Sequence, residues 1–531
     1  MKLQFIGATH GVTGSVHLLQ ACGKNILIDY GMRQGREEDV DYALPISAAQ
    51  VDAVLVTHSH IDHTGYLPLL AKGGYKGPIF STEATADLCR IMLLDSANIQ
   101  EQDAEWENRK NKRSGKKLVE PLYTSDDAMA VLKLFRGVDY LETVQVCPGV
   151  TACFHDVGHL LGSAAIEINI DEDGEKRTVV FSGDVGNIDQ PLIKDPQFIK
   201  YADYIVCEST YGDRLHTVVK DYREALAQVI QSTFDRGGNV VIPAFAVGRT
   251  QELLYFLRDI ITKKMIKGHR VPVYLDSPLA IEAVKVFDDN IYGYFDDDAM
   301  AVVKSGIDPI NFPTLKTTVT SDESKQINFD KEPKVIISAS GMCDAGRIRH
   351  HLKHNLWREE SSVVFVGYQA EGSLGRRLLD GVKKVKLFGE TIEVKADIIK
   401  LDGISGHADQ KGLLRWLSGF ENRPQKLFLV HGDADVLPVF EEKIKKELGW
   451  SVYCPYYTDT FDLVSGQQTR VAPKTVVSRP KAEGGISKAY AALLAAAEKL
   501  IAVIKKASGY PNGDLRDAAR AIEDICEKLD R

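Results

Sequence analysis

Several features that would define a membrane or secreted protein are missing from this sequence. No stretch approaches the roughly 20 consecutive apolar residues that a membrane-spanning helix needs. In residues 1–7 no long apolar core follows the single charge, so we expect no secretory signal peptide. The eight cysteines are scattered and form no Cys-x-x-Cys pair, which is typical of reduced thiols in a cytoplasmic protein.

An excess of positive charge is also missing. The net charge is −9, from 65 Lys and Arg against 74 Asp and Glu, which argues against a wholly basic coat for nucleic acid. A negative net charge does not exclude a local basic groove, because nucleic-acid binding depends on local patches of positive charge rather than on the net charge of the protein. A chain of 531 residues is too long for one ordinary core, and its 44% apolar and 26% charged content describes a globular protein of two or three domains.

Histidine is scarce, at 14 residues, yet three histidines lie in one loop. Residues 53–56 are apolar and predict a buried strand. Four polar side chains follow within six positions: His58, His60, Asp62 and His63. A lone histidine after a strand is usually structural, but this spacing predicts a metal site, with the first two able to bind one ion and the last two a second. Imidazole and carboxylate without thiolate suit zinc, or another borderline divalent ion, at a catalytic site.

This His-x-His-x-Asp-His string is the signature of the metallo-β-lactamase fold, and the chain resembles that superfamily. The resemblance implies three further ligands at later strand ends: a His, a bridging Asp and a final His. His159, Asp184 and His431 stand in that order beside glycines. Asp29, at the end of another apolar strand, is predicted to hold the His loop by hydrogen bonds rather than to bind metal, although a turn-capping Asp is the commoner case.

The resemblance also implies how the ligands divide. One ion would be bound by His58, His60 and His159, the other by Asp62, His63 and His431, with Asp184 shared. The expected cofactors are two Zn²⁺, with Mn²⁺ or another divalent ion as an alternative. Such a pair lowers the pKa of water towards 7, so that a hydroxide exists at neutral pH to attack phosphorus.

Between residues 209 and 394 the pattern changes to alternating strands and helices, which predicts a parallel sheet in a separate α/β domain. Its strand–turn–helix segments carry Arg249, Arg347 and His351, which we predict as substrate-binding residues because helix N-termini and arginine can receive a phosphate. Each segment alone is weak evidence, since most such turns contain glycine for packing. Together and in this order they resemble the β-CASP insertion of metallo-β-lactamase nucleases.

Three strand-end residues match the β-CASP motifs: Glu208, His407 and His431. The resemblance implies that His407 is the general acid, with Glu208 bonded to its far nitrogen to keep it cationic. Members of the family that act on RNA carry His at the third motif, whereas the DNA-repair members carry Val, so His431 favours RNA. The chain is similar to the nuclease subunit of the cleavage and polyadenylation specificity factor and its bacterial and archaeal ribonuclease relatives.

The predicted fold is an α/β protein: an αββα metallo-β-lactamase sandwich with an inserted β-CASP domain and a C-terminal helical extension. The expected boundaries are residues 1–208 and 395–462 for the sandwich, 209–394 for the insertion, and 463–531 for a linker and helical hairpin. Residues 83–142 look helical and include a run, 108–117, in which six of ten residues are cationic. Such a run is most often a solvated, mobile loop, but next to a nuclease site it could hold phosphates.

The sequence therefore predicts a zinc-dependent ribonuclease that hydrolyses single-stranded RNA in cytoplasmic RNA processing or decay, without a membrane. Two alternatives stay open: a DNA-processing nuclease of the same fold, and a non-catalytic RNA-binding subunit of a processing complex. The second requires lost ligands, and no expected ligand is missing. Whether the tail packs on its own protein, forms a homodimer or docks a partner of a processing complex is open, as is endonucleolytic against exonucleolytic cutting.

Overall fold

A computed structural model describes residues 1–34, 43–217, 221–403, 405–473, 496–497, 499–501, 503–505 and 512–529. The chain forms two compact units, Met1–Val476 and Val477–Arg531. In the second unit the structure describes helix α15 (Asn512–Leu529), whereas most of the predicted linker and first tail helix lie outside the described residues. No helix in the described ranges combines the length and apolarity needed to cross a bilayer.

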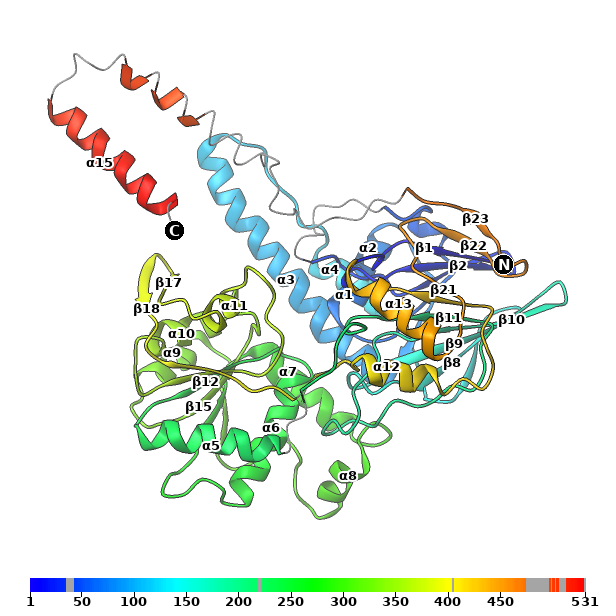
Figure 1. Cartoon of the computed structure of the whole chain (residues 1–531), viewed down its shortest axis with the longest axis horizontal. Helices are drawn as coiled ribbons and strands as arrows, with labels where there is room; N and C mark the ends of the chain where they lie inside the picture. The colour runs from blue at the N-terminus through cyan, green and yellow to red at the C-terminus, as the bar shows by residue number, and fades with distance from the viewer. Residues whose placement is uncertain are drawn as a thin grey trace. The chain divides into compact units, whose positions relative to one another are not determined.

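Two mixed sheets face each other in the first unit (Figure 1). The first has the spatial order β23 (Gln468–Arg470), β22 (Thr460–Asp462), β1 (Lys2–Phe5), β2 (His17–Ala21), β3 (Lys24–Ile28), β4 (Ala53–Leu55), β5 (Ile79–Thr82) and β6 (Phe135–Val138). The second has the order β21 (Val452–Tyr453), β20 (Lys426–Leu429), β11 (Tyr204–Cys207), β10 (Glu175–Phe181), β9 (Ala164–Glu172), β8 (Val150–Asp156) and β7 (Thr143–Cys147). Their facing side chains, among them Phe5, Phe154 and Phe428, form one buried core.

Helices cover both outer faces and complete the predicted four-layer αββα sandwich. The first sheet is covered by α1 (Ile61–Thr64), α2 (Leu67–Lys72), α3 (Glu83–Ser114) and α4 (Ser125–Leu132), and the second by α12 (Gln410–Leu417) and α13 (Val436–Glu447). Two expectations need correction. Residues 83–142 are not helical throughout, because β6 pairs with β5. The expected linker after 462 contains a strand, β23, which pairs with β22.

The insertion contains a six-stranded sheet in which every pairing is parallel. Its order is β14 (Leu315–Thr317), β13 (Val273–Leu275), β15 (Val335–Ser338), β12 (Val240–Pro243), β16 (Ser362–Phe365) and β19 (Asp397–Lys400). One face packs on α5 (Tyr222–Asp235), α6 (Arg249–Thr262), α7 (Pro278–Asp289) and α8 (Asp297–Lys304), the other on α9 (Ser321–Phe329), α10 (Ile348–Asn355) and α11 (Leu374–Leu379). A hairpin of β17 (Lys384–Leu387) and β18 (Glu390–Glu393) precedes β19, which lies in the insertion's sheet although the predicted boundary fell at 394.

The insertion and the sandwich share a buried core. Leu160 and Leu161, from the loop after β8, belong to the same apolar cluster as α6 and α7 of the insertion. The first turns of α3 add Ala84 and Leu88 to this cluster. Burial of apolar area is the main favourable term in folding, so this cluster holds the insertion against the sandwich next to the predicted site.

A buried carboxylate, Asp276, ties the insertion's helices to its sheet. It follows β13 and is fully buried. Its Oδ1 accepts hydrogen bonds from Arg347 Nη1 at 2.7 Å and Thr318 Oγ1 at 2.6 Å, and its Oδ2 lies 2.6 Å from both Ser324 Oγ and His351 Nε2. Arg347 and His351 were predicted to bind substrate, but here their polar groups bond within the insertion. His351 is also fully buried within this network, and substrate binding by either residue stays a prediction.

Replacing Asp276 with alanine should destabilise the protein by about 3–5 kcal/mol. Removing one partner of a buried ion pair leaves the remaining charged and polar groups buried without a hydrogen-bond acceptor. Asp322→Ala is the matched control: that carboxylate is 89% exposed and pairs with Lys325 on the same helix. Its effect should stay within about 0.5 kcal/mol. Urea unfolding of the two variants measures the difference, and equal stability would contradict the role of the network.

The same network should make stability sensitive to acid. Burial raises the pKa of Asp276, but hydrogen bonds from His351, Ser324 and Thr318 outweigh it and hold the pKa well below the ordinary 3.8. A depressed pKa contributes stability above the unfolded-state value, and that contribution is lost as the pH falls through and below about 4. Between pH 6 and pH 3 the wild type should therefore lose more unfolding free energy than Asp276→Ala, as measured by urea unfolding across this pH range.

Candidate metal centre

The His loop is held in place by Asp29. Its buried carboxylate accepts hydrogen bonds from the backbone N of Thr57 at 2.8 Å and from Thr57 Oγ1 at 2.9 Å, and its Oδ2 lies 2.7 Å from His63 Nδ1. Asp29 thus fixes both the start of the loop after β4 and the ring orientation of His63. The sequence predicted no role for Thr57, although its position directly before His58 places it beside the metal-binding loop.

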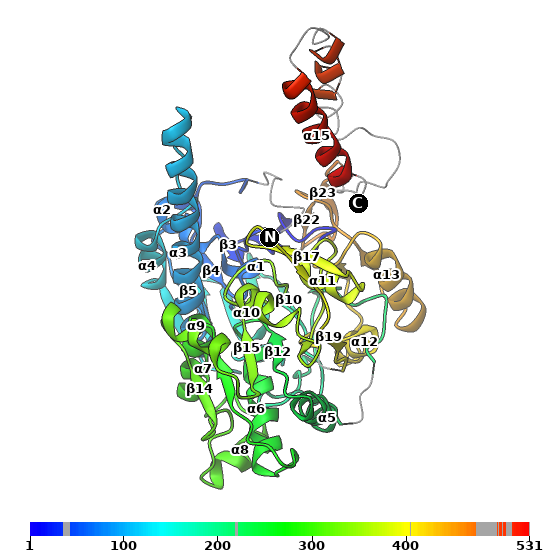
Figure 2. The ribbon, with the colours of Figure 1, turned by 90° about the vertical axis from the view of Figure 1, so that its left-hand side faces the viewer.

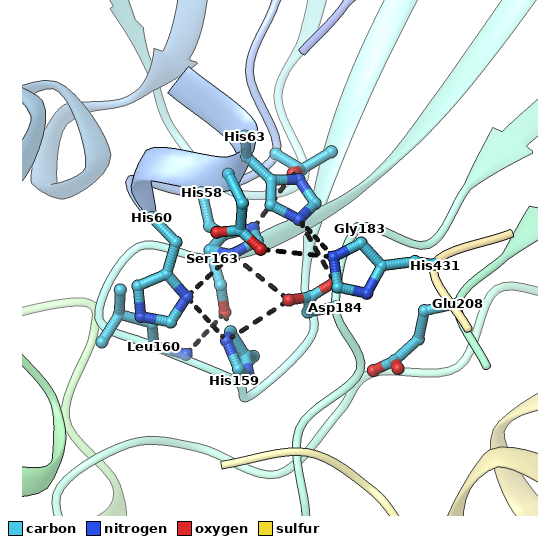
Figure 3. A network of polar contacts seen from close by, with 12 residues as sticks. His58, His60, His63, His159, Leu160, Ser163, Gly183, Asp184, Glu208 and His431 are labelled. Carbon is cyan, nitrogen blue, oxygen red and sulfur yellow. Dashed lines mark hydrogen bonds and ion pairs between the residues drawn. The ribbon is translucent and has the colours of Figure 1, made fainter. Parts of the chain in front are cut away.

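Two sets of ligand atoms converge at this loop (Figure 3). In each set the side-chain atoms lie within 4.8 Å of one another: His58, His60, His159 and Asp184 in the first, and Asp62, His63 and His431 in the second. In the first, His60 Nδ1 lies 3.1 Å from His58 Nε2 and 3.2 Å from His159 Nε2. The structure therefore brings together residues from four separate parts of the chain.

Asp184 lies between the two sets. Its Oδ2 is 3.5 Å from His58 Nε2, in the first set. Its Oδ1 is 3.4 Å from His63 Nε2 and 3.7 Å from His431 Nδ1, in the second. Within the second set, His431 Nε2 is 3.3 Å from His63 Nε2 and 3.4 Å from Asp62 Oδ2. One carboxylate thus presents a different oxygen to each set.

The donor set fits divalent cations. Burial lowers the pKa of His58, His60 and His159, which favours the neutral ring, the form that binds metal. Their ring nitrogens face one another at hydrogen-bond distance, and a shared cation would satisfy several lone pairs at once. Burial also lowers the pKa of His63, but Asp184 and Asp29 outweigh it and raise that pKa, so this ring has negative charge on both sides.

Further contacts orient the ligands from behind. His159 Nδ1 lies 2.8 Å from the backbone oxygen of Gly406, which leaves Nε2 to face the first set, and its backbone N donates to Ser163 Oγ at 3.0 Å. His431 Nδ1 lies 3.2 Å from Thr210 Oγ1. Such hydrogen-bond partners fix the orientation of each imidazole ring and so determine which ring nitrogen can bind a metal. No pattern in the sequence selected Gly406, because its contact with His159 joins segments 247 residues apart.

His407 lies beside this centre and contacts Glu208. Its Nδ1 is 3.2 Å from Glu208 Oε1 and 4.0 Å from Asp184 Oδ2. The buried Glu208 carboxylate is itself fixed by the backbone N of Val185 at 2.7 Å and of Thr210 at 3.0 Å. Burial lowers the pKa of His407, but Glu208 and Asp184 outweigh it and raise the pKa to about 9. Glu208 also falls within 4.8 Å of Asp184 and His431, whereas His407 belongs to none of the ligand sets among the described residues.

The insertion contacts the loop that carries His159 at the start of α6. Gly248, with a φ of 82°, begins α6 so close to Leu160 that an added Cβ would lie 3.0 Å from its side chain. The guanidinium of the next residue, Arg249, pairs with Glu252, and phosphate binding by Arg249 stays a prediction. Tyr211, for which the sequence predicted no role, has its ring centroid 6.0 Å from that of His407.

A four-layer sandwich with paired His and carboxylate ligand sets at its strand ends defines a metallo-β-lactamase-type hydrolase. Three family models match the chain: "Metallo-beta-lactamase superfamily" over residues 11–83, "Beta-Casp domain" over 250–378, and "Zn-dependent metallo-hydrolase RNA specificity domain" over 391–455. These matches follow the sandwich, the insertion and the return to the sandwich in chain order.

The chain is also similar in sequence to known proteins. The chain is 36% identical to "Ribonuclease TTHA0252" of Thermus thermophilus over 82% of its own length and 94% of that protein. It is 32% identical to "Transcription termination factor FttA" of Methanosarcina mazei, covering 89% of this chain and 72% of that one, and 30% identical to its namesake from Methanocaldococcus jannaschii, covering 86% and 71%. The chain belongs to the β-CASP family of metal-dependent nucleases within the metallo-β-lactamase superfamily.

Proposed function

We propose that this protein is a zinc-dependent ribonuclease that hydrolyses phosphodiester bonds of single-stranded RNA, leaving 5′-phosphate and 3′-hydroxyl ends. The observation that carries the proposal is Asp184, which presents one oxygen to each of two His-containing ligand sets. The matched RNA specificity domain and a relative named as a ribonuclease support RNA as the substrate. A cytoplasmic role in RNA processing or decay stays a prediction of the sequence.

In this proposal each ligand set holds one zinc ion. His58, His60 and His159 would hold the first ion, Asp62, His63 and His431 the second, and Asp184 would contribute to both. Bound divalent ions lower the pKa of water and stabilise negative charge on the attacked phosphate. Asp29 keeps His63 in position through its bond to Nδ1, so that Nε2 faces the second set.

His407 acts as the general acid in this proposal. Glu208 engages its Nδ1 and is itself fixed by two backbone N–H groups, so the ring cannot turn freely. Its Nε2 is then the nitrogen that can donate a proton to the leaving 3′ oxygen of the RNA. The side chain is 22% exposed, and so is accessible to a substrate at the edge of the metal centre.

The domain division is part of the proposal. With the two boundaries corrected for β19 and β23, residues 1–208 and 401–470 form the catalytic sandwich, 209–400 the β-CASP insertion, and the chain after β23 the extension. The insertion shares its core with the loop that carries His159, and a large second lobe beside the metal centre suits a polymer better than a small substrate.

The test compares labelled single-stranded RNA and DNA of matched sequence, with and without a chelator, read at nucleotide resolution. We expect cleavage of the RNA only, loss of cleavage with the chelator, recovery on adding Zn²⁺ or Mn²⁺, and about two zinc ions per chain by elemental analysis. Cleavage of the DNA alone would support the DNA-processing alternative. Binding of RNA without cleavage, in a metal-loaded protein, would support the non-catalytic alternative.

A further inference from the structure

The distal half of α3 leaves the core, and we name residues 98–117 the α3 arm. The buried residues of the helix lie between Ala84 and Ala97, with Asn111 the later exception. In both views the far end of the light-blue helix stands away from the sheets (Figures 1 and 2). Only the first half of α3 contributes an apolar stripe to the core, so the distal half is not needed to complete the core.

The α3 arm has a defined structure rather than that of a mobile loop. The side chain of Asn108 exchanges two hydrogen bonds of 2.8 Å with the backbone of Val119, and Asn111 Nδ2 donates to the oxygen of Lys117 at 3.2 Å. The segment after the helix is thereby tied back along it. The basic run, which the sequence suggested to be mobile, is therefore presented on a fixed scaffold.

The end of the α3 arm, residues 108–117, is strongly basic within an acidic protein, whereas residues 98–107 carry four acids. Residues 108–117 carry six cations and no acid, in a chain whose net charge is −9. Four of these cations are exposed and have no ion-pair partner among the described residues: Lys112, Arg113, Lys116 and Lys117. The helix dipole favours cations in the last turn, but Lys116 and Lys117 lie beyond the C-cap Gly115, so this effect does not account for them.

An exposed aromatic side chain accompanies the charges. Trp106 is 60% exposed, and the ammonium of Lys110 lies 3.0 Å from its ring centroid. Proteins bind single-stranded nucleic acid by combining cations that follow the phosphates with aromatic rings on which bases stack. Trp106 and the neighbouring cations provide both on one short segment.

The base of α3 is anchored next to the metal centre. Thr82 Oγ1 and Thr85 Oγ1 donate hydrogen bonds of 2.7 and 2.9 Å to the backbone oxygen of Gly162, three residues after His159. From there the 32-residue helix extends about 48 Å at 1.5 Å per residue. A long RNA can therefore reach both places at once, whereas a very short one cannot.

We propose that the α3 arm is an accessory binding site for single-stranded RNA, separate from the metal centre. Its cations bind phosphates and Trp106 stacks on a base, which tethers a long substrate while another part of the strand is cut. This proposal rests on RNA being the substrate. Opposite charge selects the ligand, since an acidic protein attracts a polyanion only where its cations are concentrated.

Binding to a labelled RNA of about 30 nucleotides in chelator, where no cleavage occurs, tests the site across a salt series. The arm variant combines Lys112→Ala, Arg113→Ala, Lys116→Ala and Lys117→Ala. We expect its Kd to rise about tenfold or more, and the slope of log Kd against log salt to fall by about 2–3, because each phosphate contact to a single strand contributes about 0.7.

The control removes four exposed or half-exposed lysines from the region of α12 and α13: Lys200, Lys443, Lys445 and Lys446. Its net charge equals that of the arm variant, so an equal loss of affinity in both would overturn a specific site. Trp106→Ala adds an independent test, with an expected loss of about fivefold or more from stacking. Thermal unfolding shows whether each variant is folded.

Cleavage then separates this proposal from the proposed function. The arm variant should cut a tetranucleotide as fast as the wild type, yet have a KM raised about tenfold on the long RNA. A wild type that cuts neither RNA contradicts the proposed function, while the binding data still report on the arm. Unchanged affinity and salt slope in the arm variant would overturn the accessory site and assign its exposed Trp106 to a protein partner.

Discussion

Replacing Asp184 with alanine should lower RNA cleavage by at least about a thousandfold and reduce the bound metal. Each oxygen of this carboxylate faces one ligand set, so its loss removes a ligand from both sites at once. Metal ions supply several kcal/mol of transition-state stabilisation, and about 4 kcal/mol corresponds to this factor. Single-turnover cleavage and elemental analysis on the same preparation measure the two effects.

Two further variants make this result specific. Asp184→Asn keeps the shape of the side chain but removes its charge, and should lose both activity and metal. Asp298→Ala removes an exposed carboxylate from the first turn of α8 and should change neither. If Asp184→Ala kept its full metal content and cleaved RNA at the wild-type rate, Asp184 would not be a shared ligand, and the proposal of a binuclear centre would be wrong.

Replacing His407 with alanine should slow RNA cleavage by about 10²- to 10⁴-fold while leaving the metal content unchanged. His407 lies outside the ligand sets, and its Nδ1 contacts Glu208 instead. An acid is needed only when the leaving oxygen is basic. The variant should therefore cleave an aryl phosphodiester, which has a good leaving group, at close to the wild-type rate.

The pair of substrates separates an acid from a structural role. His155→Ala is the matched control, because that ring pairs with Glu167 at 3.0 Å on β8, away from the ligand sets, and should leave both rates intact. Glu208→Gln should slow RNA cleavage as well, since a neutral amide no longer favours the cationic ring. Loss of metal in His407→Ala, or equal slowing of both substrates, would show that His407 does not act as the acid.

The fold class was predictable because its signals are local. Short apolar runs ended by glycine or histidine indicated the strands, and alternation of strands with helices indicated the inserted parallel sheet. The ligand string from His58 to His63 lies within six residues, so its spacing is visible without any tertiary contact. Family membership followed from the order of these segments along the chain and is confirmed by the matches to known proteins.

Other features depended on contacts between distant segments. Arg347 and His351, which were predicted to bind phosphate, both bond to Asp276, a buried carboxylate about 70 residues earlier that the sequence did not connect with them. Likewise β19 looked like the return to the sandwich, but its edge pairs with β16. Strand signals report a conformation and do not report which sheet the strand will join.

The sequence alone determined the kinds of side chain at each strand end and the order in which they come, since both are properties of the chain. Only the tertiary structure decided that the two oxygens of Asp184 face different histidines, that Glu208 contacts His407, and that the basic run lies on a fixed helix far from the metal centre. The physical reason is that distances between segments hundreds of residues apart are set by the packing of buried cores, which no local pattern encodes.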